Sequence, residues 1–452
     1  MRSGLCIGCG ACAAGEPRAI MRWDRYGQLK PDGPAHWYRR RDPAFSAICP
    51  FAPAAVDEDA IAAERFGAAP GSDPLIGRFE QAYVGHVAEE EFRSDGSSGG
   101  MVNWVASELL RTERIDAVAH VAPVVDPQRD GRFFAYRLSR SLDELRQGAK
   151  SRYYPIELSE VLRAIRAAPG HYGVVGVPCF IKAVHLLRKH DPILRERITH
   201  TLGLFCGHMK SARFAESFAW QLGTEIERVR AVEYRIKDAG RPANWYRAHL
   251  TLAGGETRAE DWWHLIDGDW GAGSFQNSAC NMCDDVVAET ADIAFGDAWV
   301  EPYSSDGRGT NVVIVRSPEL REMVEAGVAA GRLALETVDA DFIIETQAAG
   351  LRHRREGLAY RLTWRRRGVT PRKRVAPSAA GLPLRRRLVY RTRAAVSRWS
   401  HRMFALARTL DAPFLYVVWA RAALAVYQGL TYSRGRLGAW FDRLERAAAR
   451  SD

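Results

Sequence analysis

Eight cysteines carry the clearest chemical signal in this sequence, and they fall into two groups of four. Cys6, Cys9 and Cys12 stand at two-residue spacings, and Cys49 is followed directly by a proline. Three thiolates on a tight glycine-containing loop can each reach a different iron of a cubane, and a remote Cys-Pro can close the fourth corner. Zinc is the alternative, although structural zinc usually takes two Cys-x-x-Cys knuckles. The first cysteine group therefore predicts an iron–sulfur cluster.

The second cysteine group is dispersed and consists of Cys179, Cys206, Cys280 and Cys283. By spacing alone these residues suit zinc, an iron–sulfur cluster or partial burial in the core. Apolar runs before Cys179 and Cys206 read as buried strands, and open α/β sheets gather their ligands at the carboxyl ends of strands. We therefore expect a shared metal or cluster site, with His208 either as a substitute ligand or as a solvated neighbour.

Ser97, Ser98, Gly99 and Gly100 precede a helical pattern of apolar residues. Serine hydroxyls and glycine amides at a helix N-terminus suit an anion, because the free N–H groups and the helix dipole point at it. An ordinary N-cap and turn is the other interpretation. A Gly-x-Gly-x-x-Gly fingerprint is absent from the sequence, which weakens the case for a nicotinamide cofactor bound in the Rossmann manner.

A second polar segment joins Lys150, Ser151 and Arg152 to Tyr153, just before a predicted helix over 157–167. Cationic and aromatic groups in one turn can hold a phosphate and stack on a ring. A surface turn is equally compatible with this composition.

The elements that must position these residues alternate between strand and helix patterns. Residues 172–206 have βαβ character, and 229–252 read as an antiparallel insertion. Residues 292–299 and 311–316 read as further strands, followed by a helix from Pro318 to about residue 330. The predicted fold class is α/β with α+β elements.

Composition fits this picture. The chain has 452 residues, of which 47% are hydrophobic and 26% charged, so a disordered chain and a disulfide miniprotein are excluded. The N-terminus lacks the apolar stretch of a signal peptide, so we expect a cytoplasmic protein whose cysteines bind metal or do redox chemistry.

The net charge of +10 hides a split between an acidic body and a basic C-terminal region. Residues 351–452 carry 24 basic and 5 acidic side chains, whereas the first 350 carry 40 basic and 49 acidic. The apolar run 413–427 is interrupted by Arg421, so a membrane-spanning helix is not expected. We expect a helix lying on a membrane surface or on a partner subunit, or else packed on its own domain. No nucleic-acid motif accompanies the arginines, so no nucleic acid is expected.

Taken together, the sequence resembles the coenzyme F-420 hydrogenase/dehydrogenase beta-subunit family, which includes 7-hydroxymethyl chlorophyll a reductases. The resemblance covers roughly residues 1–335 and is carried by seven segments in family order: Cys6–Cys12, Ser97–Gly100, Lys150–Tyr153, Val177–Cys179, Gly203–Cys206, Cys280–Asp284 and Ala291–Trp299.

The resemblance implies a flavoprotein that holds FAD beside a 4Fe-4S cluster whose ligands are the four cysteines of the second group. It implies that Ser97–Gly100 and Lys150–Tyr153 contact FAD. Two clusters place the chain near the chlorophyll-reductase-like or ferredoxin-accepting branch, with the N-terminal cluster as the entry for a ferredoxin-type carrier. Asp297 is a candidate polar group near the flavin, with a structural strand-end role as the alternative.

The predicted organisation is a ferredoxin-like cluster domain (1–67), two parts of a central mixed-sheet domain (75–170 and 171–350) and a basic helical tail (351–452), with a linker at 68–74. The predicted function is an oxidoreductase that passes electrons through two 4Fe-4S clusters and FAD to a deazaflavin coenzyme or an organic metabolite. The alternatives are an electron-transfer subunit active only in a complex and a zinc-stabilised partner subunit. A peripheral location at the inner membrane face is a further expectation for the tail.

Overall fold

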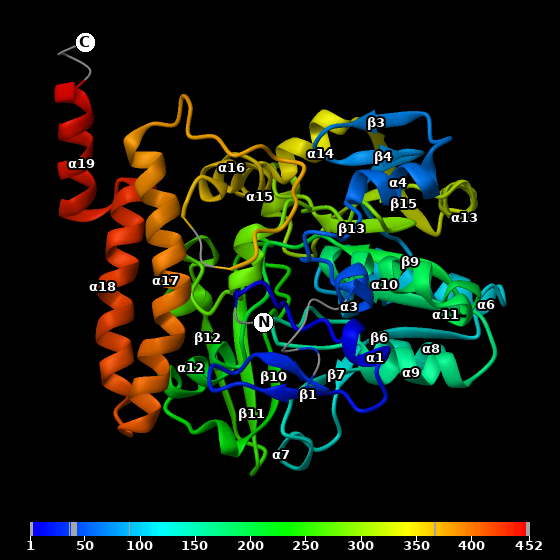
Figure 1. Ribbon diagram of the computed structural model, residues 1–452, viewed down its shortest axis with the longest axis horizontal. Helices are drawn as coiled ribbons and strands as arrows, with labels where there is room; N and C mark the ends of the chain where they lie inside the picture. The colour runs from blue at the N-terminus through cyan, green and yellow to red at the C-terminus, as the bar shows by residue number, and fades with distance from the viewer. Residues whose placement is uncertain (1–2, 36, 38–42, 90, 366–367, 449–452) are drawn as a thin grey trace.

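The computed structural model describes residues 3–35, 37, 43–89, 91–365 and 368–448. The strands of its main sheet are β5 (Gln81–Val87), β6 (Ala117–Pro123), β7 (Phe134–Ser139), β8 (Tyr172–Gly176), β9 (Ile198–Leu204), β13 (Ile293–Asp297), β14 (Asn311–Val315) and β15 (Leu333–Val338). They form an eight-stranded sheet in the order β15-β5-β14-β13-β9-β8-β6-β7 (Figure 1).

The sheet is mixed. The neighbours β6 and β8, β8 and β9, and β9 and β13 are parallel, whereas the flanking pairs are antiparallel. Parallel neighbours need crossover connections, and a helix fills each one that the βαβ pattern predicted. The predicted α/β class with a central mixed sheet is confirmed.

Helices cover both faces of this sheet, because alternate residues of each strand point to opposite sides. Val118 and Val175 pack with α6 (Met101–Arg111) and α13 (Pro318–Ala329) on one face. Ala119 and Val174 pack with α9 (Ser159–Ala167) and α10 (Pro178–His190) on the other face. The second face also contains the cysteines, so the sheet and two helices form the floor of the candidate site.

The N-terminal residues form α1 (Ala11–Ala14), β1 (Ile20–Trp23), β2 (Leu29–Asp32), α3 (Pro43–Ile48) and α4 (Glu58–Phe66). Cys9 and Phe51 belong to the same buried apolar cluster as Phe180 of α10, so this segment packs directly on the central sheet domain. The linker predicted at 68–74 instead contributes β3 (Gly71–Asp73), which pairs with β4 (Gly77–Phe79) in a short hairpin.

A second layer of strands confirms the predicted antiparallel insertion. It consists of β10 (Val229–Glu233), β11 (Arg247–Leu252) and β12 (Thr257–Asp261), all antiparallel. Figure 1 shows this sheet beside the paired helices α17 (Leu384–Thr409) and α18 (Pro413–Tyr432). Phe404 and Tyr416 of these helices share a buried cluster with Leu250 of β11.

The remaining helices of four residues or more are α5 (Phe92–Asp95), α7 (Pro127–Asp130), α8 (Leu142–Arg146), α11 (Pro192–Arg197), α12 (Arg213–Gln221), α14 (Ala340–Thr346), α15 (Ala348–Arg354), α16 (Glu356–Leu362) and α19 (Gly435–Ala448), with a 3-10 helix η5 (Ser278–Met282).

Packing continues across position 350, where the sequence changes from acidic to basic. Leu358 of α16 belongs to the buried cluster that contains Cys9, and Phe404 is fully buried. The helices α15 to α18 are therefore built into the body by apolar contacts, which corresponds to the third alternative for the basic region. The boundary at 350 itself stays a prediction.

None of the described helices is both long enough and apolar enough to cross a bilayer.

We predict that Phe404→Ala lowers the free energy of unfolding by about 3–5 kcal/mol, the usual cost of truncating a buried phenylalanine. Phe404 stacks on Trp220 with ring centroids 4.2 Å apart and also contacts Phe275. Chemical denaturation measures the change, and Leu406→Ala on the exposed side of α17 is the matched control. Equal stability of the two variants would show that α17 does not dock as described.

Candidate functional site

The structure brings the four thiols of the first cysteine group together. Cys6 and Cys9 lie in the loop that enters α1, Cys12 lies within α1, and Cys49 directly follows α3. Each of Cys9, Cys12 and Cys49 interacts electrostatically with other thiols of the group, Cys6 included. Burial raises the pKa of all three, so as free thiols they would stay protonated. A cation bound among them would supply the charge that deprotonation requires.

Two glycines let this loop curl. Gly8 and Gly10 have φ angles of +85° and +80°, where a side chain is strained. A Cβ on Gly10 would also lie 2.3 Å from a carboxyl oxygen of Glu157. The loop is fixed to α9 because the amide of Leu158 donates to the carbonyl of Cys9 at 2.9 Å.

The four thiols of the second cysteine group also lie close together. This agrees with the predicted positions of Cys179 and Cys206 at the ends of β8 and β9. Cys179 lies in the first turn of α10, just after β8, and Cys206 lies two residues after β9. Cys280 and Cys283 come from η5 and the residue after it. Cys179 interacts with the other three thiols, and burial raises the pKa of all four.

The spacing of the sulfurs distinguishes zinc from a cubane. Zinc with four thiolates at about 2.3 Å holds their sulfurs within about 4 Å of one another. In the described part of the chain, three metal-ligand atoms lie mutually within 4.8 Å only at Glu260, Asp261 and His264. Neither cysteine group is therefore as compact as a tetrahedral zinc site, whereas a cubane spreads its thiolates over four irons.

The two groups are neighbours. Cys9 is among the thiols that act on Cys179, and the hydroxyl of Tyr136 interacts with both cysteines. Tyr136 is anchored by its hydrogen bond to the carbonyl of Val175 at 2.8 Å and by stacking on Phe180. One tyrosine on β7 thus lies between the two sets of thiols.

Sequence reasoning missed a cation beside the second group. Arg354 is fully buried, and its guanidinium donates to the carbonyls of Cys206 and Cys280 at 3.2 and 3.3 Å. Burial opposes its charge, yet the four thiols hold the pKa of Arg354 above its usual value. The arginine-rich composition after residue 350 is the only sequence signal for it.

His208, the suggested substitute ligand, is buried and stacks on Trp270 with centroids 4.0 Å apart. Burial, with Lys210 and Arg393 nearby, lowers its pKa, so the imidazole is neutral. Trp270 also contacts Tyr153 at 4.9 Å. A chain of aromatic rings therefore leads from the Lys150–Tyr153 segment to the loop that carries Cys206.

The two segments that resemble flavin contacts lie side by side. The amide of Ser151 donates to the hydroxyl of Ser97 at 2.9 Å, and Ser98 donates to the carbonyl of Thr310 at 2.9 Å. Ser97, Arg235 and Lys237 all line one pocket. The structure therefore joins the two predicted segments, although Ser97 and Ser151 are 54 positions apart in the sequence.

Packing and backbone conformation explain why positions 99 and 100 are glycine. A Cβ on Gly99 would lie 2.8 Å from the carbonyl of Gly85, and Gly100 has a φ of +88°. The first amide of α6, at Met101, donates to the side chain of Asn311 at 3.1 Å. Close packing and a cap from β14 thus explain the glycines, and a ligand would use the neighbouring serines and cations.

Those cations are Lys150, Lys237 and Arg235, which repel one another. Burial lowers the pKa of Lys237 to about 7, with Lys150 and Arg235 adding to the effect. Its ammonium group donates to the carbonyl of Ser98 at 2.8 Å. This gathering of positive charge next to Ser97 suits a phosphate-bearing ligand.

Asp297 is already paired. Its carboxylate accepts from Arg235 at 3.0 and 3.4 Å, and Arg235 lies over the ring of Tyr246 at 4.2 Å. Tyr153, whose pKa burial raises, contacts the same arginine. The carboxylate therefore orients a buried guanidinium at the edge of the pocket.

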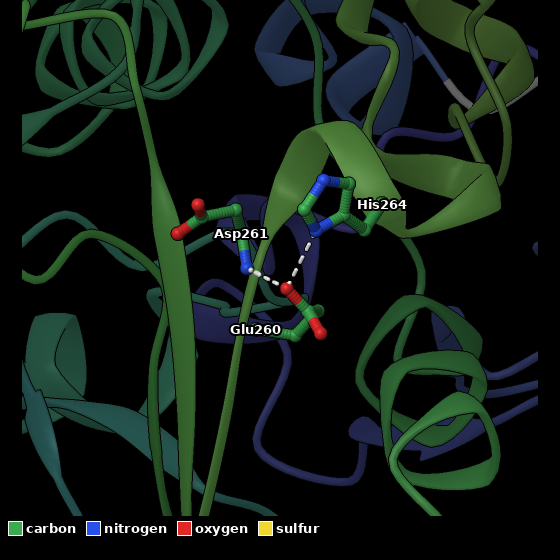
Figure 2. Close-up of side chains that lie close together, drawn as sticks. All are labelled: Glu260, Asp261 and His264. Atoms are coloured by element: carbon green, nitrogen blue, oxygen red, sulfur yellow. Dashed lines mark hydrogen bonds and ion pairs between the residues drawn. The ribbon is translucent and has the colours of Figure 1, made fainter.

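Figure 2 shows the compact group at Glu260, Asp261 and His264, where His264 and the amide of Asp261 both bond to Glu260. The carboxylate of Asp261 is held by Arg241 and by the indole of Trp245. Its side chains thus already have protein partners, and the group lies at the end of β12, away from both cysteine groups in sequence.

Comparison with known family models covers the central domain, and the matched residues begin after the first cysteine group. The model of the coenzyme F420 hydrogenase/dehydrogenase beta subunit N-terminus matches residues 82–163, and that of its C-terminus matches residues 170–341. A coenzyme F420-dependent sulfite reductase from Methanocaldococcus jannaschii is 24% identical over 344 residues, which are 72% of this chain and 46% of that protein. The chain thus spans about half the length of this curated relative.

Among solved structures, the F420-reducing [NiFe] hydrogenase complex from Methanosarcina barkeri contains a similar chain. Its TM-score is 0.49 at 17% identity, over 64% of this chain and 94% of that chain.

We predict that Asp297→Asn lowers the free energy of unfolding by about 3 kcal/mol, because the guanidinium of Arg235 is left buried without its partner. Urea denaturation measures the loss, and Asp238→Asn at a more exposed carboxylate is the control. If Asp297→Asn keeps full stability but loses turnover, the residue acts in chemistry and not in positioning Arg235. If both are kept, Asp297 lies outside the functional site.

Proposed function

Because the chain belongs to the coenzyme F420 hydrogenase/dehydrogenase beta-subunit family, a family of oxidoreductases, we propose that it is an iron–sulfur flavoprotein. It transfers electrons between a ferredoxin-type carrier and a two-electron acceptor. Two 4Fe-4S clusters and FAD would serve this reaction, since clusters carry single electrons and a flavin collects two and exchanges a hydride.

The observation that carries this proposal is the convergence of four buried thiols from the ends of β8 and β9 and from η5. Their distribution over distant segments and their wide spacing favour a cubane bound by Cys179, Cys206, Cys280 and Cys283. The proximity of Cys9 to Cys179 supports a second cubane at the first group, close enough for electron exchange.

We place FAD at the pocket beside Ser97. Lys150 and Lys237 would neutralise its phosphates, and Tyr153 would lie toward its ring. Ser98 and Ser151 hold the two segments in place. The aromatic contacts from Tyr153 through Trp270 to His208 support a flavin position near the second cluster.

The name of the relative, a coenzyme F420-dependent reductase, favours a deazaflavin coenzyme as the two-electron partner, with an organic metabolite as the alternative. Because this chain spans about half of that protein, an electron-transfer subunit that works only with a partner is the second candidate. Reoxidation of the reduced protein by candidate acceptors is measured with and without partner proteins. Reoxidation without a partner supports an enzyme that works alone, and reoxidation only with a partner supports the electron-transfer subunit.

We predict that anaerobically purified protein is brown, releases flavin and contains about eight iron atoms per chain, and that Cys283→Ala contains about four. Iron, zinc and flavin analysis measures this. Ser278→Ala, also in η5, is the control and retains all of its iron. A colourless protein with two zinc ions would favour the zinc-stabilised partner subunit instead.

We further propose that the outer face of α18 rests on an anionic membrane surface. Phe414 and Val418 are 64% and 62% exposed, and Asp411 is the only acidic residue in 384–432. An apolar helix face surrounded by arginines is the usual pattern of a peripheral membrane helix.

We predict that Val418→Glu weakens sedimentation with anionic vesicles roughly tenfold, because one buried valine contributes about 1.5 kcal/mol or more. Val125→Glu, at a 97% exposed position on the β6–α7 connection, is the control and binds like the unmodified protein. Equal binding of all three proteins, or binding to neutral vesicles alone, would contradict a charge-assisted membrane contact.

A further inference from the structure

Buried arginines from the region after residue 350 surround the second cysteine group. Arg354 of α15 and Arg361 of α16 are 2% and 1% exposed. Both lie beyond the residues that the family models match, which end at 341. A buried cation is costly unless a negative group compensates it, so these positions require an explanation.

The contacts of Arg354 point to the thiols as that compensation. Its guanidinium donates to the carbonyls of Cys206 and Cys280 and to that of Gly207, the last at 2.6 Å. Within the described residues, no carboxylate forms an ion pair with Arg354. Its planar fork spans two cysteine-bearing loops, and its charge faces the sulfurs.

Arg361 holds the loop between the two cysteines of η5. Its side chain donates to the carbonyl of Asn281 at 2.7 Å and to that of His353 at 2.8 Å. Lys373 lies near Cys283 as well, but its ammonium is paired with Asp284 at 2.9 Å. Arg354 is therefore the cation that acts on all four thiols, buried Arg393 acts on Cys280 as well, and Arg361 supports the site through the carbonyl of Asn281.

The first cysteine group has different surroundings. Glu157 acts on Cys9, and Lys30 donates to the carbonyl of Cys6 at 2.6 Å. Arg163 and Arg166 donate to the carbonyls of Ala13 and Ala14 behind Cys12 at 2.6 and 2.8 Å, and both are only partly buried. Lys30 is only partly buried, so water screens its charge. The second group thus differs in having a fully buried guanidinium, that of Arg354, which acts on all four of its thiols.

Reduction of a thiolate-bound cluster adds one negative charge, and nearby buried cations stabilise the reduced form more than the oxidised one. We propose that Arg354, supported by Arg361, raises the reduction potential of the second centre above that of the first. Electrons accepted at the N-terminal centre then pass inward to the centre beside the flavin. Arg354 is a positioning and tuning residue here, and this inference rests on the proposed function.

The test is an anaerobic potentiometric titration of the full chain, followed by electron paramagnetic resonance, with Cys283→Ala used to identify the signal of the second centre. In the unmodified protein the second centre is reduced first. In Arg354→Gln, the ratio of oxidised to reduced second centre at a fixed potential rises at least tenfold. For a one-electron couple this equals a fall of 59 mV in the reduction potential. The first centre does not shift.

Two further variants separate charge from structure. Arg352→Gln removes an exposed arginine from the same helix and leaves both potentials unchanged. Arg354→Lys keeps the charge and stays within threefold of the unmodified ratio. If Arg354→Gln loses its iron, Arg361→Gln is measured in its place, and we expect the reduction potential of the second centre to fall in that variant as well.

The outcomes are distinct. Absence of two paramagnetic centres in the unmodified protein overturns the proposed function. Two centres whose potentials do not respond to Arg354→Gln or Arg361→Gln, a first centre that is reduced before the second, or a shift in Arg354→Lys as large as in Arg354→Gln overturns this inference alone.

Discussion

The need to keep eight thiols inside a protein and still let them become thiolates is the constraint on which this structure depends. Burial raises the pKa of seven of the thiols, so neither group can ionise without positive charge from a bound metal or from the protein. The fold meets this need by bringing the cysteine-bearing segments together beside the parallel strands and by placing Arg354 next to the second group.

Because the N-terminal segment shares one apolar core with the sheet domain, the distance between the two cysteine groups is set by packing and not by a flexible linker. Cys9, Phe180 and Cys283 belong to the same cluster, and Tyr136 lies between the groups. A fixed separation suits electron exchange between two centres, since no domain movement is needed to bring them together. It also explains why the segment at 68–74 forms a hairpin against the body.

Much of the fold was predictable because it follows from local patterns. The apolar run before Cys179 predicts β8, and the parallel pairing of β8 with β9 follows from the helix between them. The convergence of Cys179 and Cys206 follows in turn, since parallel strands end at the same edge. Spacing and context already favoured one shared site for all four cysteines, but no local pattern placed η5 beside the ends of β8 and β9, because η5 belongs to a long irregular connection. The resemblance to a family supplied that link, as it did for Ser97 and Lys150.

The buried arginines were not predictable, because an arginine in a basic region normally indicates a solvated surface. Arg354 is buried because carbonyl oxygens of the second cysteine group accept its hydrogen bonds and the nearby sulfurs favour its charge. Its hydrogen bond to the carbonyl of Cys206 joins residues 148 positions apart in the sequence. The excess of positive charge after residue 350 therefore has two destinations. One part lies in the interior, where Arg354 acts on the thiols and Arg374 pairs with Glu289, and the other lies on the outer faces of α17 to α19. The excess of basic residues after position 350 thus includes both buried and surface arginines. Only the packing of α15 and α16 shows which arginines are buried.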